Sequence, residues 1–306
     1  MTNITCVDEN YSTTRLLTRE NPVIENKLED KFESVLFLPE GEGRQGEGGL
    51  RTQGYFKTSH ADKPLITVVT VVFNGEKFLE ETIQSVINQT YDNVEYIIID
   101  GGSTDGTLDI IRQYEHAIDY WVSERDRGIS DAFNKGIYCS LGEVIGLINA
   151  DDYYFVDALE NISKVLLSNK SRNKNFVLHG KTKKITLDGK IKDKNDNKTS
   201  WCLCVPFSHC SSFISKSAYK QLGVYDLTFK IAMDVDLLFR CREKADFFDT
   251  NVYIATQRDG GVSDQFRVKG YREYISAAKG RCNIVKLCFY FTVKVLVIYL
   301  NRLKNV

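Results

Sequence analysis

The pattern of apolar and polar positions changes sharply at Pro64. Residues 1–63 are mostly polar, with one apolar cluster at 35–38 and glycines at 41–49 that interrupt regular structure. Beyond this point, short β-branched apolar runs alternate with segments in which apolar residues recur at helical spacing. We therefore expect an N-terminal extension, either a poorly packed arm or an accessory lobe, followed by a folded domain over 64–265.

Apolar runs rich in Val and Ile have the composition of strands buried on both faces. They cover 65–73, 93–100 and 143–148. The helical spacing of apolar residues predicts helices at 76–89, from 103 to about 114 and at 130–138. Because strand and helix alternate, the pattern predicts an α/β fold with a single, mostly parallel sheet and flanking helices.

Polar residues follow these strands directly. Asn74 comes after the first strand, Asp100 closes the second, and Asp151 follows the third. The carboxyl ends of parallel strands meet at one edge of the sheet, and polar residues there line the ligand crevice. The pattern therefore predicts a ligand site at this edge.

The adjacent carboxylates Asp151 and Asp152 are the candidates for metal chemistry. At the mouth of a buried strand they repel each other, which raises the pKa of one unless a cation lies between them. Magnesium takes few protein carboxylates and completes its shell with phosphate and water, and such an ion would neutralise a departing nucleoside diphosphate. An ordinary Asp-Asp turn is the alternative, and the nearby Asp100 and Asn74 favour the metal site.

Composition narrows the class of protein. The 306 residues are 42% hydrophobic and 26% charged, which is typical of a globular protein with a core, and a net charge of −1 creates no field that favours nucleic acid. The polar N-terminus lacks the apolar run of a signal peptide, so we expect a cytoplasmic protein with reduced thiols. The group Cys202, Cys204, His209 and Cys210 fits zinc spacing poorly, and we expect ordinary buried thiols there.

The motifs taken together resemble glycosyltransferase family 2, the inverting enzymes of the GT-A fold, over 66–154. The resemblance is carried by the segments 71–75, 98–106, 126–137 and 147–152. Their order and spacing are specific, although no single segment is. The last two segments resemble the branch that builds bacterial capsule, exopolysaccharide and O-antigen.

The resemblance implies a donor half over 64–157. Phe73 and Asn74 would lie against the nucleoside, Asp100 would read a uracil ring, and Asp151 would hold Mg²⁺ or Mn²⁺. The other donor-side residues implied by the resemblance are Asp131, Asn134, Lys135 and Asn149.

Two positions depart from the family pattern. Asn149 occupies the first acidic position of the Asp-x-Asp motif, which removes a negative charge but keeps hydrogen bonding to a ribose. Phe133 stands where the family often has Arg, just before Asn134. Lys135 or Arg127 would have to supply the missing positive charge.

The resemblance is looser in the acceptor half, 158–265. The segment 229–237 matches the family's catalytic-base region, and Asp234 takes the place of the base. Inversion requires the acceptor hydroxyl to attack from the face opposite the diphosphate, and a carboxylate within reach can take its proton. Asp236 is the alternative, because helical spacing aims the two side chains differently. Both aspartates would also be favoured simply at a helix N-terminus.

Two further features of the acceptor half are open to more than one interpretation. His209 either contacts the acceptor or a phosphate, or is a structural histidine. Asp188-Gly189 between two short apolar runs predicts a hairpin in the basic stretch 169–198, whose lysines form either a solvated face or an anion site. The segment 260–263 would be a flexible loop that closes over the diphosphate.

The segment 266–306 is basic and apolar. From 267 onward it carries nine Lys or Arg against one acidic residue. Between 282 and 300 it is mostly apolar, but the uninterrupted stretches are too short to span a bilayer. A narrow polar stripe is formed by Asn283, Lys286, Tyr290, Lys294 and Asn301. We expect an amphipathic helix over 280–306 that lies on anionic lipid at the inner face of the plasma membrane, with a core-packing or dimer helix as the alternative.

These features together predict an inverting sugar transfer from a nucleoside diphosphate sugar, in the first place a UDP-sugar, to a glycan or lipid-linked acceptor in surface polysaccharide synthesis. A sugar-phosphate nucleotidyltransferase would need a Gly-rich, basic loop after the first strand, which 72–76 lacks. A non-catalytic carbohydrate-binding or scaffold protein would retain the fold alone, and the presence of Asp100, Asp151 and Asp234 argues against it. No spacing encodes the sugar or the linkage.

Overall fold

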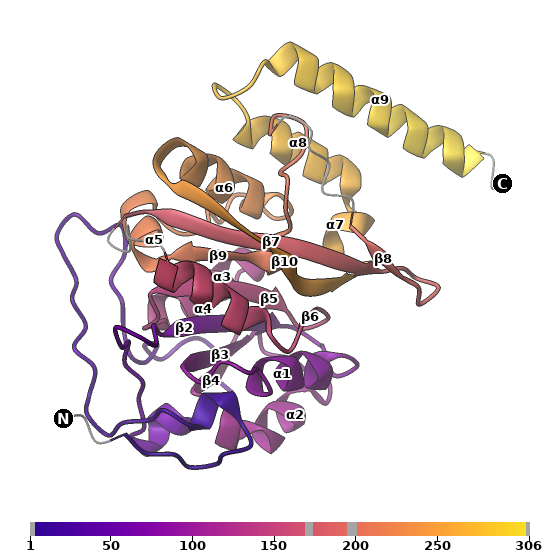
Figure 1. Cartoon of the computed structure of the whole chain (residues 1–306). Coiled ribbons are helices and arrows are strands. Elements are labelled where there is room, and N and C mark those ends of the chain that lie inside the picture. Colours follow the sequence, from indigo (N-terminus) through magenta and orange to yellow (C-terminus); the bar gives the residue numbers. More distant parts are fainter. Residues whose placement is uncertain (1–3, 169–173, 195–200, 304–306) are drawn as a thin grey trace.

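The computed structural model describes residues 4–168, 174–194 and 201–303, and in this part of the chain it contains a ten-stranded sheet (Figure 1). The centre of the sheet is parallel. Its strands are β2 (Ile66–Val72), β3 (Val94–Asp100), β4 (Tyr120–Ser123) and β5 (Val144–Asn149). All residues of β2 and β3 are buried, as their continuous apolar runs predict. The predicted α/β fold with a mostly parallel central sheet is confirmed.

Helices cover both faces of this sheet. One face packs against α1 (Leu79–Ile87), α2 (Thr107–Gln113) and α4 (Ala158–Ser168). The other face packs against α3 (Ile129–Cys139), α5 (Lys216–Leu222) and α6 (Met233–Lys244). The short 3₁₀ helices η3 (Glu115–Ala117) and η4 (His209–Ser211) lie in the connections before β4 and β9. Two hydrophobic cores therefore hold the strand ends of the sheet in fixed positions.

The second half of the chain extends the sheet beyond β5 with mixed pairing. Its strands are β6 (Tyr153–Tyr154), β7 (Phe176–Ile185), β8 (Ile191–Asp193), β9 (Ser212–Ser215) and β10 (Asp246–Arg258). β9 is antiparallel to β5 and to β7, and β10 is parallel to β7. β10 also pairs with β6, which brings its last residues beside the residues that follow β5. β7 and β8 form the predicted hairpin, although part of the basic stretch lies outside the described residues.

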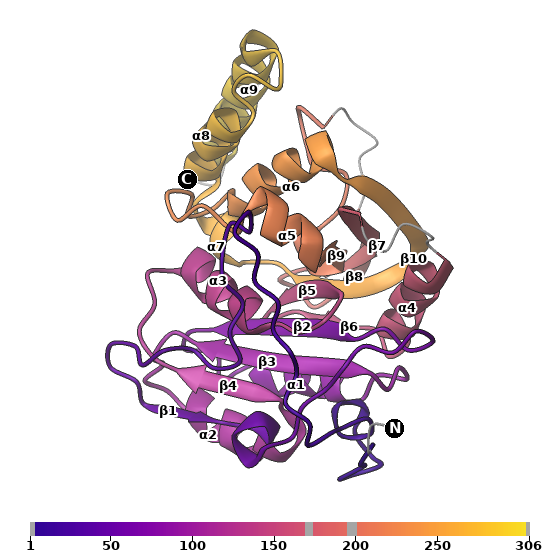
Figure 2. The ribbon, with the colours of Figure 1, turned by 90° about the vertical axis from the view of Figure 1, so that its left-hand side faces the viewer.

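The N-terminal extension packs onto the sheet. It contributes β1 (Gly46–Gly48), which is antiparallel to β4, and the 3₁₀ helices η1 (Ser12–Thr14) and η2 (Leu50–Gln53). It runs past α5 and α3 on its way to β1 (Figure 2). Two of its side chains form buried ion pairs, Arg51 with Glu95 and Lys57 with Asp119. The expectation of a poorly packed arm is therefore wrong for 4–63, because the extension is held by buried charge pairs that an apolar pattern does not reveal.

The C-terminal segment forms α7 (Val262–Gln265), α8 (Arg267–Ala277) and α9 (Ile284–Leu303). α9 packs on α8 through Leu287 and Phe291, whose ring stacks on Tyr271 with 4.7 Å between centroids. Figures 1 and 2 show both helices outside the sheet and its covering helices. In the described part of the chain, no helix combines the length and hydropathy that crossing a bilayer requires.

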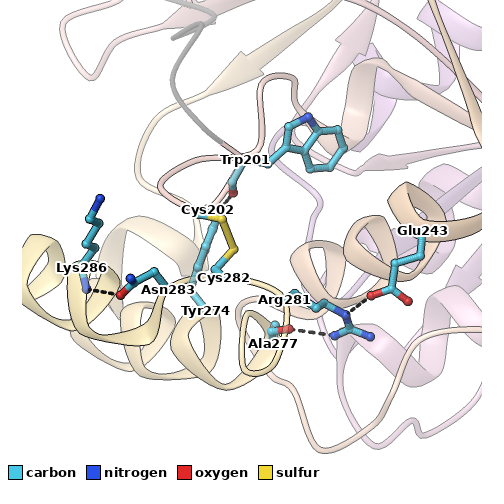
Figure 3. The surroundings of a disulfide bond; sticks show 9 residues. All are labelled: Trp201, Cys202, Glu243, Tyr274, Ala277, Arg281, Cys282, Asn283 and Lys286. Atoms are coloured by element: carbon cyan, nitrogen blue, oxygen red, sulfur yellow. Dashed lines mark hydrogen bonds and ion pairs between the residues drawn. A yellow bond between two sulfur atoms is a disulfide. The ribbon is translucent and has the colours of Figure 1, made fainter.

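A disulfide joins Cys202 to Cys282, 80 residues apart, at the turn that precedes α9 (Figure 3). Cys204 is an exposed free thiol, and Cys210 is a buried one. The expectation of ordinary buried thiols is confirmed for Cys210 and is wrong for Cys202 and Cys204, and the disulfide contradicts the expectation of reduced thiols at Cys202 and Cys282. The pairing depends on contact between two segments far apart in the sequence, so local spacing does not indicate it.

Candidate functional site

The loops after β2 and β3 are fastened to each other. β2 and β3 end level, with Val72 opposite Asp100. Asn74 takes a left-handed backbone conformation with φ 52°, which Asn tolerates better than most residues. Its Oδ1 accepts a hydrogen bond from the N–H of Thr104 at 2.8 Å, and its own N–H donates to Ser103 Oγ at 2.7 Å. Asn74 thus fixes both loops at the strand ends.

Asp100 is completely buried at the same place. Its carboxylate accepts hydrogen bonds from the N–H of Ser103 at 3.1 Å, from the Ser103 hydroxyl and from the Ser123 hydroxyl. These bonds link the ends of β3 and β4. Asp100 is completely buried and already accepts these bonds, and its contact with a uracil ring stays a prediction.

Phe73 is the exposed aromatic side chain at the end of β2, with 64% of its surface accessible. The adjacent Gly101 makes room for its neighbours: a Cβ there would lie 2.4 Å from Asp126 Oδ2 and 3.5 Å from the Phe73 ring. An exposed ring at a strand end offers a flat face for a planar base.

The segment around α3 contains three of the predicted donor residues, and each has a protein partner. Asp131 pairs with Arg127 at 2.8 Å; burial opposes ionisation of Asp131, but the bonds from Arg127 outweigh it and lower its pKa. Lys135 Nζ pairs with Glu124 at 2.7 Å. Of the two cations considered for the diphosphate, Arg127 is mostly exposed and Lys135 is mostly covered.

Asn134 is buried in a two-way bond with the backbone of Tyr225. Its Nδ2 donates to the Tyr225 carbonyl at 2.9 Å, and its Oδ1 accepts from the Tyr225 N–H at 2.9 Å. The side-chain amide is therefore used to join α3 to the loop before α6. It links the two predicted halves of the domain.

Asn149 and His209 meet across the boundary between the two halves. Asn149 Nδ2 lies 3.4 Å from His209 Nε2, and Asn149 Oδ1 is buried without a hydrogen-bond partner among the described residues. Burial lowers the pKa of His209, and the positive charge of Lys194 acts in the same direction, whereas Asp234 and Asp151 act against them. The donor-side Asp151 and the acceptor-side Asp234 therefore both act on this one imidazole.

Burial dominates the electrostatics of the adjacent carboxyl groups of Asp151 and Asp152. Burial raises the pKa of Asp151. Burial, followed by the charge of Asp151, raises the pKa of Asp152 to about 8. Asp152 Oδ1 accepts from the Arg258 N–H at 3.0 Å, while Oδ2 is buried without a partner in the described structure.

Two cations beside this pair were not found by sequence reasoning. Arg258, at the end of β10, donates from Nη1 to the Asp151 carbonyl at 2.5 Å and pairs with Glu81 of α1. Lys194 donates from Nζ to Ser208 Oγ at 2.6 Å and to Gln257 Oε1 at 2.9 Å. Arg258 closes β10 and Lys194 follows β8, so their distance in sequence from Asp151 hides them.

Asp234 and Asp236 differ in their surroundings. Asp236 is paired with Arg240 at 3.0 Å and lies 3.8 Å from Arg281. Asp234 Oδ1 accepts from the N–H of Val235 at 2.8 Å, and its charge helps to raise the pKa of Tyr225 after the larger effect of burial. The ion pairs of Asp236 make it the weaker candidate for a base.

The atoms at the end of β5 suit a metal that takes few protein ligands. In the described ranges, no group of three or more His, Cys, Asp or Glu side chains is placed to hold a metal. The unpartnered buried oxygens of Asn149 and Asp152, beside the carboxylate of Asp151, offer hard oxygen ligands. A Mg²⁺ or Mn²⁺ ion that completes its shell from phosphate and water fits this set.

The central parallel sheet, with polar groups gathered at its strand ends, defines a GT-A type of α/β protein. The chain belongs to glycosyl transferase family 2, whose model matches residues 67–222. An uncharacterized glycosyltransferase of Rickettsia typhi is 29% identical over 223 residues, which cover 69% of each chain. TuaG of Bacillus subtilis, named as a candidate teichuronic acid biosynthesis glycosyltransferase, is 37% identical over 101 residues, covering 32% of this chain and 40% of TuaG.

Solved structures share the fold at low sequence identity. S. aureus TarS 1–349 in complex with UDP-GlcNAc has a TM-score of 0.55 and 15% identity, over 73% of this chain and 69% of that one. The mannosyltransferase PcManGT of Pyrobaculum calidifontis, in complex with GDP-Man and Mn²⁺, has a TM-score of 0.56 and 16% identity, over 74% and 68%. The family relationship and the shared fold confirm the predicted class, a glycosyltransferase of the GT-A type.

Proposed function

We propose that this glycosyltransferase transfers a sugar with inversion from a nucleoside diphosphate sugar, preferably a UDP-sugar, to a glycan or lipid-linked acceptor in surface polysaccharide synthesis. The observation that carries the proposal is the approach of the donor-side Asn149 to the acceptor-side His209 at 3.4 Å, with the charges of Asp151 and Asp234 both raising the pKa of that imidazole against the larger effect of burial. The names of TuaG and of TarS with UDP-GlcNAc support a surface polymer and a UDP-sugar.

On the donor side, Phe73 would stack on the base, and Asn149 would hydrogen-bond the ribose through its side-chain amide. Asp151 would hold Mg²⁺ or Mn²⁺, an ion that neutralises charge on the leaving diphosphate. Arg258 keeps the Asp151 backbone in place, and the exposed Arg127 is the cation available to a phosphate. The complex of PcManGT with GDP-Man and Mn²⁺ supports a divalent ion.

On the acceptor side, Asp234 would take the proton of the attacking hydroxyl. Burial lowers the pKa of His209, so its imidazole is neutral near pH 7. It can therefore donate a hydrogen bond to the acceptor substrate, or accept one from it, without adding charge. Asp236 stays in its ion pairs with Arg240 and Arg281.

Two variants separate donor binding from chemistry. Asp151→Asn should weaken metal-dependent donor binding, measured by calorimetry with UDP-, GDP- and dTDP-sugars in Mn²⁺. Asp234→Asn should bind the donor normally and lose transfer, with a fall in rate of about 100-fold or more for the lost base. Normal transfer by Asp234→Asn would show that the base assignment is wrong.

A second part of the proposal concerns α9 and the membrane. α9 rests on α8 through Leu287 and Phe291, and its opposite side is apolar and exposed. The exposed apolar side chains are Val285, Phe289, Val293, Leu296 and Leu300. Because basic residues flank this face, an anionic lipid surface suits it, and a lipid-linked acceptor would be found there. The cytoplasmic location stays a prediction, and the Cys202–Cys282 disulfide is an observation against a reducing compartment.

A further inference from the structure

The turn that leads into α6 is held by a carboxylate from outside the predicted catalytic domain. Oε2 of Glu273, on α8, accepts hydrogen bonds from three successive backbone N–H groups. The donors are Lys230 at 3.0 Å, Ile231 at 2.7 Å and Ala232 at 2.9 Å. One oxygen therefore fixes the direction of three consecutive peptide units.

This turn immediately precedes Asp234. Ala232 is the N-cap residue of α6, and its methyl side chain cannot satisfy the free N–H groups at the helix start. A carboxylate at this end also interacts favourably with the positive end of the helix dipole. Glu273 thus holds the backbone that enters α6, up to the N–H of its N-cap residue, and the orientation of the first turn, with Asp234 in it, depends on α8.

The other side of the same turn is tied to the donor half. Lys230 Nζ donates to the carbonyl of Arg127 at 2.9 Å, and Ser130 Oγ donates to the carbonyl of Phe229 at 3.1 Å. The backbone before Asp234 is therefore held between α3, which follows the donor loops, and α8.

α8 is itself fastened to the acceptor half by contacts that Figure 3 displays. The Tyr274 hydroxyl donates to the carbonyl of Trp201 at 2.7 Å, and the next residue, Cys202, is bonded to Cys282. Arg281 pairs with Glu243 of α6 at 2.7 Å. The Tyr274 hydrogen bond and the disulfide hold α8 in place, so Glu273 stays beside the start of α6, whereas the Arg281–Glu243 pair is a more exposed contact near the C-terminal end of α6.

We propose that Glu273 is a positioning residue for Asp234, so that the C-terminal segment completes the catalytic site. This inference rests on the proposed function, in which Asp234 is the base. It also implies that a domain boundary at 265 would remove a part of the machinery.

The test compares Glu273→Ala with Glu273→Gln and with the control Glu243→Ala, which removes another bond between α6 and the C-terminal segment. With the sugar nucleotide that supports transfer, Glu273→Ala should lower kcat by about 10- to 100-fold and leave the donor KM within about twofold, since a small displacement of a catalytic group has this effect. Glu273→Gln keeps an acceptor oxygen and should recover part of kcat. Glu243→Ala should stay within about twofold of the wild type.

Hydrogen exchange provides a readout that does not depend on activity. The amides of Ile231 and Ala232 should exchange faster in Glu273→Ala than in the wild type. Their exchange rates should be unchanged in Glu243→Ala. If Glu273→Ala does not fold, Glu273→Gln decides by the same two measurements. The inference is overturned if the Glu273 variants keep the kcat of the wild type. It is also overturned if Glu243→Ala lowers kcat as much as Glu273→Ala does. If Asp234→Asn transfers the sugar normally, Asp234 is not the base and the proposed function is wrong at that point. If Asp234→Asn is inactive while Glu273→Ala is fully active, only the role of Glu273 is wrong.

Discussion

At the scale of single residues, the site contains a carboxyl group, that of Asp152, whose pKa the fold raises. Burial raises the pKa of Asp152 to about 8, helped by the charge of Asp151, and one of its oxygens lacks a partner among the described residues. The unfolded chain has an ordinary Asp pKa near 4. As pH rises from about 4 to about 8, the unfolded state therefore loses its proton before the folded state does, and stability falls.

Asp152→Asn should remove this loss. Asparagine keeps the oxygen that accepts from the Arg258 N–H and cannot ionise. Without metal, the variant should melt at a higher temperature than the wild type at pH 8 and at about the same temperature at pH 4, as measured by calorimetry. A difference of the same size at both pH values would show that ionisation of Asp152 is not the cause.

The residues of the site were predictable to the extent that their positions are local. Asn74, Asp100 and Asp151 lie directly after buried strands, so the apolar runs locate them. Arg258 reaches the same place through the long pairing of β10 with β7, and Lys194 follows β8 and bonds Gln257 of β10, and no short pattern encodes either contact. The role of Asn134 as a link to Tyr225 depends likewise on a contact 91 residues away.

At the scale of elements, the helix predicted in the apolar and basic C-terminal segment is present as α9. The structure also shows which side of α9 is exposed. The outward side of α9 is apolar, and the side that packs on α8 contains Leu287 and Phe291. The sequence pattern does not tell these sides apart, because both are apolar and only the position of α8 distinguishes them.

The double variant Phe289→Glu/Leu296→Glu should therefore bind anionic vesicles more weakly. Burying two large apolar side chains contributes about 3 kcal/mol or more, so sedimentation with phosphatidylglycerol vesicles should need roughly 100-fold more lipid. The control is Leu187→Glu, which changes a still more exposed apolar residue on the β7–β8 hairpin and should bind normally. Unchanged vesicle binding by the double variant would exclude α9 as the lipid contact. If the wild type is a dimer and the double variant is a monomer with unchanged vesicle binding, this face binds a second copy of the chain.

At the scale of the whole molecule, the N-terminal extension and the C-terminal segment are both built into the fold. Lys57 of the extension is buried against Asp119, which precedes β4, and Arg51 is buried against Glu95 of β3. The central strands were predictable because each is a continuous apolar run. The attachment of the extension was not, because polar residues that pair in the core look like surface residues in the sequence.

Lys57→Met should destabilise the protein strongly, since it leaves Asp119 buried without its cation. The expected loss in free energy of unfolding is about 3–5 kcal/mol, measured by urea denaturation. Lys63→Met removes the more exposed pair with Asp92 and should change stability by about 1 kcal/mol or less. Equal effects of the two substitutions would mean that the extension does not provide a buried charge partner.

The central claim is transfer of a sugar from a nucleoside diphosphate sugar at the end of β5. The most direct measurement is release of the nucleoside diphosphate from UDP-, GDP- and dTDP-sugars in Mn²⁺ or Mg²⁺, for the wild type and for Asp151→Asn. We predict release from one class of donor, strongest for a UDP-sugar, that is lost on chelation of the metal and in Asp151→Asn. Release that is unaffected by chelation and by Asp151→Asn, or no binding and no release with any of these donors, would contradict the account.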